Sequence, residues 1–224
     1  MCGRFTLRAT LADVADYFRI DHLPDWDWPA RFNLAPTQAV LAVRLTGDGR
    51  REMVRLRWGL IPSWAKDLNI GSRLINARAE TAHEKPSFRT AFARRRCLVA
   101  ADGYYEWKKT EAGKQPYLFE MSDRSLFAIA GLWERWLGDE GDAIESVTLL
   151  TVPASPDTEA VHHRMPAILP REQFGTWLGE SPTADSRCRA LLRPPSEGTL
   201  RMRPVSSFVN RPMHEGPQCV APPR

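Results

Sequence analysis

Four strand-like segments follow one another between residues 104 and 152, and they decide the fold. They are YYEWKK (residues 104–109), QPYLFEM (115–121), LFAIAGLWERW (126–136) and IESVTLLTV (144–152). The stretches TEAGK, SDRS and GDEGDA that separate them are rich in residues that favour turns. Strands joined in sequence by short turns predict an antiparallel meander.

Further strands are expected on both sides of this meander. In REMVRLRW (51–58) apolar and charged residues alternate with the period of a strand, and AVLAVRL (39–45) precedes it across the turn TGDGR. CLVAA (97–101) and MPAIL (165–169) are short apolar strands, and RMRPVS (201–206) closes the sheet. The proline-rich stretch 23–38 is expected to be a loop without regular structure.

Helices are expected to be short and to flank the sheet. Residues 10–19 carry an apolar stripe behind a capping box made by Thr10 and Asp13. Residues 84–96, 171–180 and 184–192 are the other predicted helices. The predicted fold class is therefore α+β: a single domain over residues 1–224, mainly antiparallel β-sheet curled into a barrel-like core.

Composition limits the classes of function. The 224 residues are 43% hydrophobic and 26% charged, and the net charge of +4 favours anionic partners only weakly. The four cysteines show no CxxC spacing, so neither a zinc site nor a thioredoxin-like motif is indicated. No ligand cluster suggests another metal, and no cofactor is predicted. No apolar run approaches the length of a membrane span and no signal peptide is visible, so we expect a cytoplasmic protein with reduced thiols.

Four short motifs combine reactive residues with signals of an exposed site: MCGRF, LINARAET, ADGYYEWKK and VHHRMPAIL. Each also has a purely structural interpretation. A cysteine next to the initiator methionine can be chance, an asparagine and an arginine before a helix can cap it, and a glutamate in a strand can face solvent. A histidine pair at a loop end is more often structural than catalytic.

Seven short sequence segments, which include these motifs, occur in the same order as in a known family. MCGRFT, RFNLAPTQ, WGLIPSWA, INARAET, ADGYYEWKK, HHRMPAIL and PVSSFVN resemble the SRAP (SOS response-associated peptidase) family, in that order. The resemblance covers residues 2 to about 210. The acidic segment LGDEGD and the tail 211–224 fall outside it.

The resemblance implies catalytic roles for Cys2, Asn76, Glu106 and His162. His162 is chosen over His163 because it stands two residues before Arg164, although family members commonly carry an aspartate or another polar residue where this chain has His163. It also implies a DNA-facing surface, in which Arg4 and Arg78 hold phosphates and the other members are Pro36, Trp64 and Trp107.

The implied function is DNA repair. Members of the family sense abasic sites in single-stranded DNA, or at a junction with duplex, and crosslink to them through an amino-terminal cysteine. Removal of Met1 would make Cys2 that terminus. A terminal cysteine is a 1,2-aminothiol: its amine forms an imine with the open-chain sugar aldehyde, and its thiol then closes a thiazolidine ring.

Two other functions stay open from the sequence. One is a thiol peptidase acting in trans with Cys2, His162 and Asn76, and the other is a non-catalytic single-stranded DNA-binding domain. Autopeptidase removal of Met1 would accompany the crosslinking function. The predicted protein is a monomer without a membrane partner, and it is associated with the nucleoid when bound to DNA.

Overall fold

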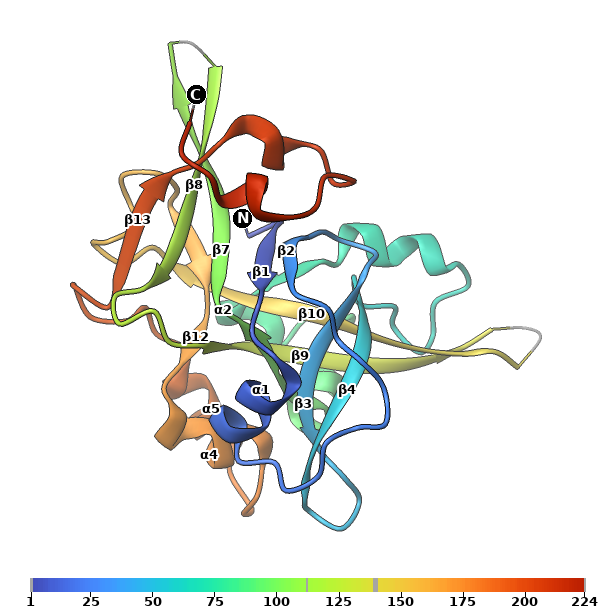
Figure 1. The fold of residues 1–224 in the computed structure, drawn as a ribbon. Helices are drawn as coiled ribbons and strands as arrows, with labels where there is room; N and C mark the ends of the chain where they lie inside the picture. The colour runs from blue at the N-terminus through green and yellow to red at the C-terminus, as the bar shows by residue number, and fades with distance from the viewer. Residues whose placement is uncertain (1, 112, 139–140, 224) are drawn as a thin grey trace.

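The structure is a computed structural model that describes residues 2–111, 113–138 and 141–223 (Figure 1). The predicted removal of Met1 and the predicted turns at 112 and 139–140 involve residues outside these ranges. Within the described part of the chain, no helix is long and apolar enough to cross a bilayer.

Five strands form a closed barrel. In order around the ring they are β3 (Ala39–Leu45), β4 (Arg51–Trp58), β10 (Ala143–Pro153), β9 (Phe127–Leu137) and β6 (Arg96–Ala101). β6 pairs back onto β3, so the ring has no free edge. The β4–β10 pair is parallel and the other four pairs are antiparallel.

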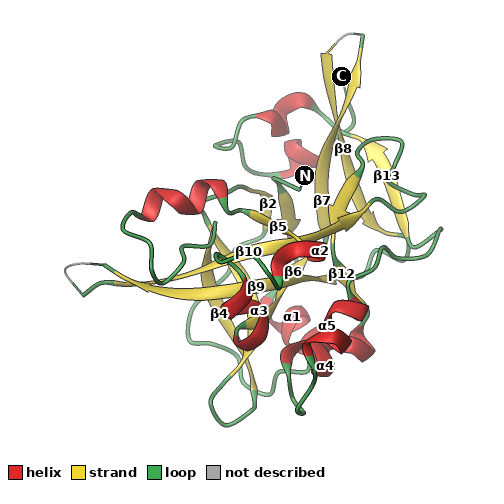
Figure 2. Ribbon diagram, turned by 180° about the vertical axis from the view of Figure 1, so that it is seen from behind, coloured by secondary structure: helices red, strands yellow, loops and turns green. Residues whose placement is uncertain are grey.

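A second sheet stands beside the barrel (Figures 1 and 2). Its strand order is β13 (Leu200–Pro204), β8 (Gly113–Met121), β7 (Gly103–Thr110), β1 (Phe5–Leu7) and β2 (Arg31–Leu34). All of its pairs are antiparallel. β1, next to the amino terminus, therefore lies inside the sheet, between β2 and β7.

Three short strands extend the barrel: β5 (Asn76–Arg78) and β11 (Arg164–Pro166) pair with β10, and β12 (Ile168–Leu169) pairs with β9. The α-helices are α1 (Leu11–Phe18), α2 (Ala79–Ala82), α3 (Arg89–Arg94), α4 (Phe174–Leu178) and α5 (Asp185–Leu191). The 3₁₀ helices are η1 (Leu68–Arg73), η2 (Arg171–Gln173), η3 (Ser207–Asn210) and η4 (Pro217–Val220).

Strand β7 separates two apolar clusters. Tyr104 faces the large core that fills the barrel, whereas Tyr105 faces a small cluster with Val205, Val209 and Cys219. Successive side chains of a strand point to opposite faces, which explains the division. The same alternation turns Glu106 toward the face of Tyr104.

The predicted fold class is confirmed: an α+β fold whose mainly antiparallel strands form a barrel with short flanking helices. β3 and β4 have the predicted limits, and the capping box of α1 is present. The predicted helix 84–96 is regular only over α3, the predicted helix 171–180 is split into η2 and α4, and MPAIL is divided into β11 and β12.

The prediction of a loop over residues 23–38 was wrong for residues 31–34 and holds for the rest of the stretch. Residues 31–34 form β2, which pairs with β1. Flanking prolines suggested irregular structure, but pairing with a strand far away in sequence determines the conformation here. Asn33 adds to this by donating from its buried side chain to the carbonyls of Arg211 and His214, at 3.0 and 2.7 Å.

Candidate active site

Strand β1 fixes the position of Cys2. Phe5 pairs with Tyr104 of β7 on one side and with Leu34 of β2 on the other. Cys2 lies three residues before Phe5 and is fully buried. The strand that follows Cys2 is therefore held between two others, close to a chain end that is usually mobile.

Asn76 contacts Cys2 directly. It is the first residue of β5 and pairs in parallel with Leu149 of β10. Its Nδ2 donates a hydrogen bond of 2.7 Å to the carbonyl oxygen of Cys2. Its Oδ1 is buried and has no hydrogen-bond partner among the described residues. Buried polar atoms nearly always take part in hydrogen bonds. This oxygen is therefore available to accept a hydrogen bond from a bound substrate.

Glu106 and His162 lie together beside Cys2. The Oε1 atom of buried Glu106 is 4.0 Å from Nδ1 of His162. Burial raises the pKa of the Cys2 thiol far above its usual range, and the negative charge of Glu106 raises it further. The thiol of Cys2 is therefore protonated at neutral pH.

The ring of His162 can exchange a proton without changing its orientation. The backbone N–H of Arg164 donates to Nδ1 at 3.0 Å, so the neutral ring carries its proton on Nε2. The carbonyl oxygen of Arg164 lies 3.1 Å from the same Nδ1, so a ring protonated there has an acceptor. A histidine with partners for both protonation states is suited to general acid–base chemistry.

An ion pair between Arg164 and Glu80 ties the histidine loop to the asparagine strand. Arg164 Nη1 and Nη2 donate to the two carboxylate oxygens of Glu80 at 2.6 and 2.9 Å. These hydrogen bonds lower the pKa of Glu80. Glu80 lies in α2, which directly follows the strand of Asn76. The bidentate pair thus fixes His162 relative to Asn76.

His163 lies on the solvent side of His162. The two rings are stacked, with centroids 4.4 Å apart and planes inclined by 25°. The pKa of exposed His163 is lowered, first by the positive charge of His162 and then by desolvation. Of the two imidazoles, His162 therefore contacts Glu106, and His163 is the exposed ring stacked on it.

Arg4 holds β1 against the carboxy-terminal segment. Its guanidinium donates to Asn33 Oδ1 and to the carbonyl of Val209, both at 2.8 Å, and lies 5.9 Å from the ring of Trp107. Trp107 donates from Nε1 to Asn210 at 2.8 Å. The acceptors of Arg4 are neutral, so its positive charge is not cancelled by an ion pair with a described carboxylate.

The other predicted DNA-binding residues have no contact in common. Arg78 is exposed at the end of β5, two residues after Asn76, and Pro36 is half-buried between β2 and β3. Trp64 has 59% of its surface exposed and lines a cavity of about 540 Å³. None of the three makes a described contact with the four predicted catalytic residues.

The loop that carries Trp64 has a tight neck. Gly59 has a φ of 118°, and a Cβ there would lie 2.5 Å from the carbonyl oxygen of Gly71. Only glycine combines this backbone conformation with so close an approach. Trp136 also donates from Nε1 to the carbonyl of Ala65 at 2.6 Å, which fixes the loop to β9. Trp64 is therefore an exposed aromatic side chain on a fixed support.

The structure brings Cys2, Asn76, Glu106 and His162 together at the junction of the two sheets. β1 and β7 supply two of them, while β5 and the residues before β11 supply the others from opposite sides of β10. Sequence reasoning missed the positioning roles of Glu80 and Arg164. Both lie in quoted motifs, but nothing in their spacing indicates that a carboxylate at 80 meets a guanidinium at 164.

The fold is a closed five-stranded barrel beside a second sheet, with the candidate site around buried Cys2 where the two meet. A family model described as SOS response associated peptidase (SRAP) matches residues 1–212. The chain therefore belongs to the SRAP family.

Relatives match over 78% to 98% of the chain. The abasic site processing protein YoqW of Bacillus subtilis is 40% identical over 222 residues, which cover 98% of this chain and 99% of that protein. The abasic site processing protein HMCES of Gallus gallus is 33% identical over 199 residues, covering 78% of this chain and 59% of its own length. A crystal structure of a protein from Bacteroides thetaiotaomicron superimposes with a TM-score of 0.86 at 28% identity, covering 99% of both chains.

Proposed function

We propose that this chain acts in DNA repair by sensing abasic sites in single-stranded DNA and capturing them covalently through Cys2, once Met1 has been removed. Relatives that match 98% and 78% of the chain are named abasic site processing proteins, which supports the abasic site as the target. The product would be a thiazolidine between Cys2 and the sugar.

The chemistry begins at the amine. An α-amino group has a pKa near 7.8 and lysine one near 10.4, so the neutral nucleophile is about a few hundredfold more abundant on the α-amine. Its nitrogen attacks C1′ of the open-chain sugar aldehyde, and loss of water gives an imine. The thiol sulfur then bonds to C1′ while its proton passes to the nitrogen, which closes the ring without a further leaving group.

The observation that carries this proposal is the state of Cys2. Its carbonyl is held by Asn76 at 2.7 Å, and its thiol is buried with a raised pKa. A thiol kept protonated does not compete with the amine for the aldehyde, and it remains intact to add to the imine afterwards. The raised pKa of the thiol thus supports an order in which the amine reacts first and the sulfur second.

The other three residues take roles that their contacts suit. His162 would deliver a proton to the ring oxygen as the sugar opens, and Glu106, with Oε1 4.0 Å from His162 Nδ1, would accept and return protons during imine formation. Asn76 would orient a sugar hydroxyl or the amine through its unbonded Oδ1.

Single-stranded DNA is the proposed partner, alone or at a junction with duplex. Arg4 and Arg78 would hold phosphates, and Trp64 and Trp107 would stack on or wedge against bases, with Pro36 beside them. We expect binding to weaken with salt and to be tighter for a single strand than for intact duplex. Equal, salt-independent affinity for both forms would contradict this part of the proposal.

A thiol peptidase acting in trans is the second candidate, and the family description, which includes the word peptidase, favours it. Such an enzyme needs a readily ionised thiol, whereas the pKa of Cys2 is raised, which disfavours peptide hydrolysis by this thiol both in trans and on the chain itself. Removal of the chain's own Met1 is therefore only a secondary activity in this proposal. The third candidate, a non-catalytic DNA-binding domain, would give no covalent product. The proposed protein acts as a monomer in the cytoplasm or on the nucleoid.

One experiment separates these candidates. The Cys2→Ser protein without Met1 keeps the α-amine and should form an imine with an abasic oligonucleotide that borohydride traps, but little stable adduct without reductant. Acetylation of the amino terminus of the wild-type protein should abolish both products although the thiol remains. A thiol peptidase would show the opposite pattern: activity lost in Cys2→Ser and kept after acetylation.

A further inference from the structure

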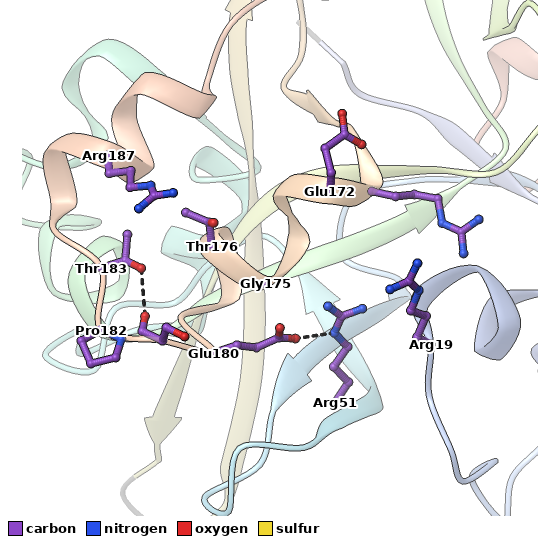
Figure 3. A pocket seen from close by; sticks show the side chains of 11 residues that line it. Arg19, Arg51, Glu172, Gly175, Thr176, Glu180, Pro182, Thr183 and Arg187 are labelled. Atoms are coloured by element: carbon purple, nitrogen blue, oxygen red, sulfur yellow. Dashed lines mark hydrogen bonds and ion pairs between the residues drawn. The ribbon is translucent and has the colours of Figure 1, made fainter.

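A second cleft lies away from the candidate active site. It has a volume of about 740 Å³ and is bordered by the end of α1, the start of β4, η2, α4 and α5 (Figure 3). Its charged lining residues are Arg19, Arg51, Arg171, Arg187, Glu172 and Glu180. In Figure 1 α1, α4 and α5 lie at the lower end of the molecule and the amino terminus lies at the upper sheet. None of the residues proposed for catalysis or DNA contact lines it.

Two of the four arginines are held in place by the protein. Arg51 is 15% exposed and donates to the carbonyl of Phe18 and to Glu180, each at 2.6 Å. The guanidinium of Arg171 lies over the ring of Tyr17, 4.8 Å from its centroid. Guanidinium groups fixed in this way lose little side-chain freedom when they bind an anion.

Arg19 and Arg187 extend the positive surface. Both are exposed, and no described hydrogen bond or ion pair involves their side chains. Arg19 ends α1 with a φ of 54°, a conformation for which glycine or asparagine is the usual choice. Figure 3 shows the side chains of Arg19 and Arg51 extending in the same direction, and both line the cleft. Like charges gathered in one cleft repel one another unless an anion lies between them.

The cleft already holds one internal anion. Glu180 Oε1 accepts from Arg51 at 2.6 Å, and a Cβ at Gly175 would collide with Glu180 Oε2. Gly175 thus leaves the space in which this carboxylate lies against α4. With two glutamates for four arginines, the cleft keeps a surplus of positive charge.

We propose that this arginine cleft binds an anion that carries phosphate groups. The guanidinium plane matches two oxygens of a phosphate at once, and cleft hydroxyls such as Thr176 add neutral donors. A volume of about 740 Å³ accommodates a diphosphate or a short length of phosphodiester backbone. The site is independent of the proposed covalent capture.

The test is calorimetric titration of the whole protein with inorganic pyrophosphate at low ionic strength. The paired change Arg19→Ala and Arg171→Ala should weaken binding at least about tenfold. The matched control is Arg89→Ala with Arg94→Ala, which removes the same charge from exposed positions on α3. No saturable binding by the wild type up to about 10 mM, or equal weakening in the control, would overturn the proposal.

A second variant keeps the test valid if the paired change disturbs folding. Glu180→Gln removes the internal carboxylate and releases Arg51, so pyrophosphate should bind about threefold to tenfold more tightly. Unchanged or weaker binding in this variant would contradict an anion site at Arg51.

Binding of single-stranded DNA of two lengths identifies the source of the phosphate groups. If the cleft takes DNA backbone, the paired arginine change will reduce the salt dependence of binding for a long DNA single strand and leave binding of a short DNA single strand unaffected. If the cleft takes a free anion, DNA of both lengths will bind as before while pyrophosphate binding is lost. In either case capture of a short abasic oligonucleotide should proceed at the wild-type rate, which separates this site from the proposed reaction.

Discussion

The closed barrel and the candidate active site are held together in different ways. The barrel strands are joined by regular ladders, and the side chains inside it are almost all apolar. The site depends on single polar contacts between residues far apart in sequence, such as Asn76 with Cys2 and Arg164 with Glu80. Stability and reactivity should therefore respond to different substitutions.

The largest difference between an effect on reactivity and an effect on stability is expected at Glu106. Glu106→Gln removes a group that exchanges protons, so the rate of covalent capture should fall about a hundredfold to ten-thousandfold. The melting temperature should change little, because glutamine has the size and shape of glutamate and keeps the packing of this buried position. The measurement is the single-turnover rate with an abasic oligonucleotide, beside thermal unfolding.

Glu120 is the matched control. It is as buried as Glu106 and lies in the same sheet, on β8, but its carboxylate pairs with Arg8 and Arg201, both at 3.0 Å. Glu120→Gln should lower the free energy of unfolding by about 1–3 kcal/mol and leave capture by the folded protein intact. If the two variants slow capture equally, burial alone and not proton transfer explains the role of Glu106.

A substitution in the barrel should lower stability and leave reactivity nearly unchanged. Ile129 is fully buried on β9, where it pairs with Val99 and Ile168. Ile129→Ala should cost about 2–5 kcal/mol of unfolding free energy, because it removes apolar contacts and leaves a cavity. Capture per folded molecule, measured below the melting temperature, should stay within about twofold of wild type, since small changes at distant sites add independently. A large loss of rate would show that the barrel transmits strain to the site.

The sequence predicted the barrel better than the site for a physical reason. In β3 and β4 the choice between apolar and polar residues depends on which face of the strand is buried. This pattern can be seen in neighbouring residues of the sequence. β2 depends on pairing with β1, about 25 residues away in the sequence, so its prolines were misleading. The residues Cys2, Asn76, Glu106 and His162 came from family resemblance, and spacing alone did not join them.

The Glu80–Arg164 pair is another contact between distant residues that the sequence pattern did not reveal. Its effect on stability can be tested by changing the pH. The pKa of folded Glu80 is lowered by hydrogen bonds from Arg164, so its contribution to stability is complete above the ordinary glutamate pKa and disappears as the pH falls through the folded value. The Glu80 side chain is 47% exposed, so solvent screening limits this contribution to at most about 1 kcal/mol.

Glu80→Gln should therefore differ from wild type in unfolding free energy at neutral pH and converge with it in acid. Because Arg164 positions His162, capture should also slow about tenfold. Denaturant unfolding between neutral and acid pH, with capture rates at neutral pH, provides both readouts. A rate unchanged in a variant that is measurably less stable would remove the positioning role.

The smallest effect is expected at His163. His163→Ala removes the stacked ring but leaves the hydrogen bonds of His162 to the backbone of Arg164. We expect capture within about threefold of wild type, and His162→Ala to be slower by about a hundredfold or more. Capture rates of the two variants measured side by side decide the matter. If His163→Ala is the more damaging change, the assignment within the pair is reversed.

The amino terminus itself gives the most direct test of the proposed chemistry. Protein that lacks Met1 should form an adduct with an abasic oligonucleotide whose intact mass is the sum of the two components minus one water, stable without reductant. The water is lost in imine formation, and ring closure by the thiol loses nothing more. Protein that retains Met1, with the same buried thiol, should give no adduct. A stable adduct with Met1 in place would show that the thiol or a lysine captures the sugar, and would contradict capture by the α-amine of Cys2.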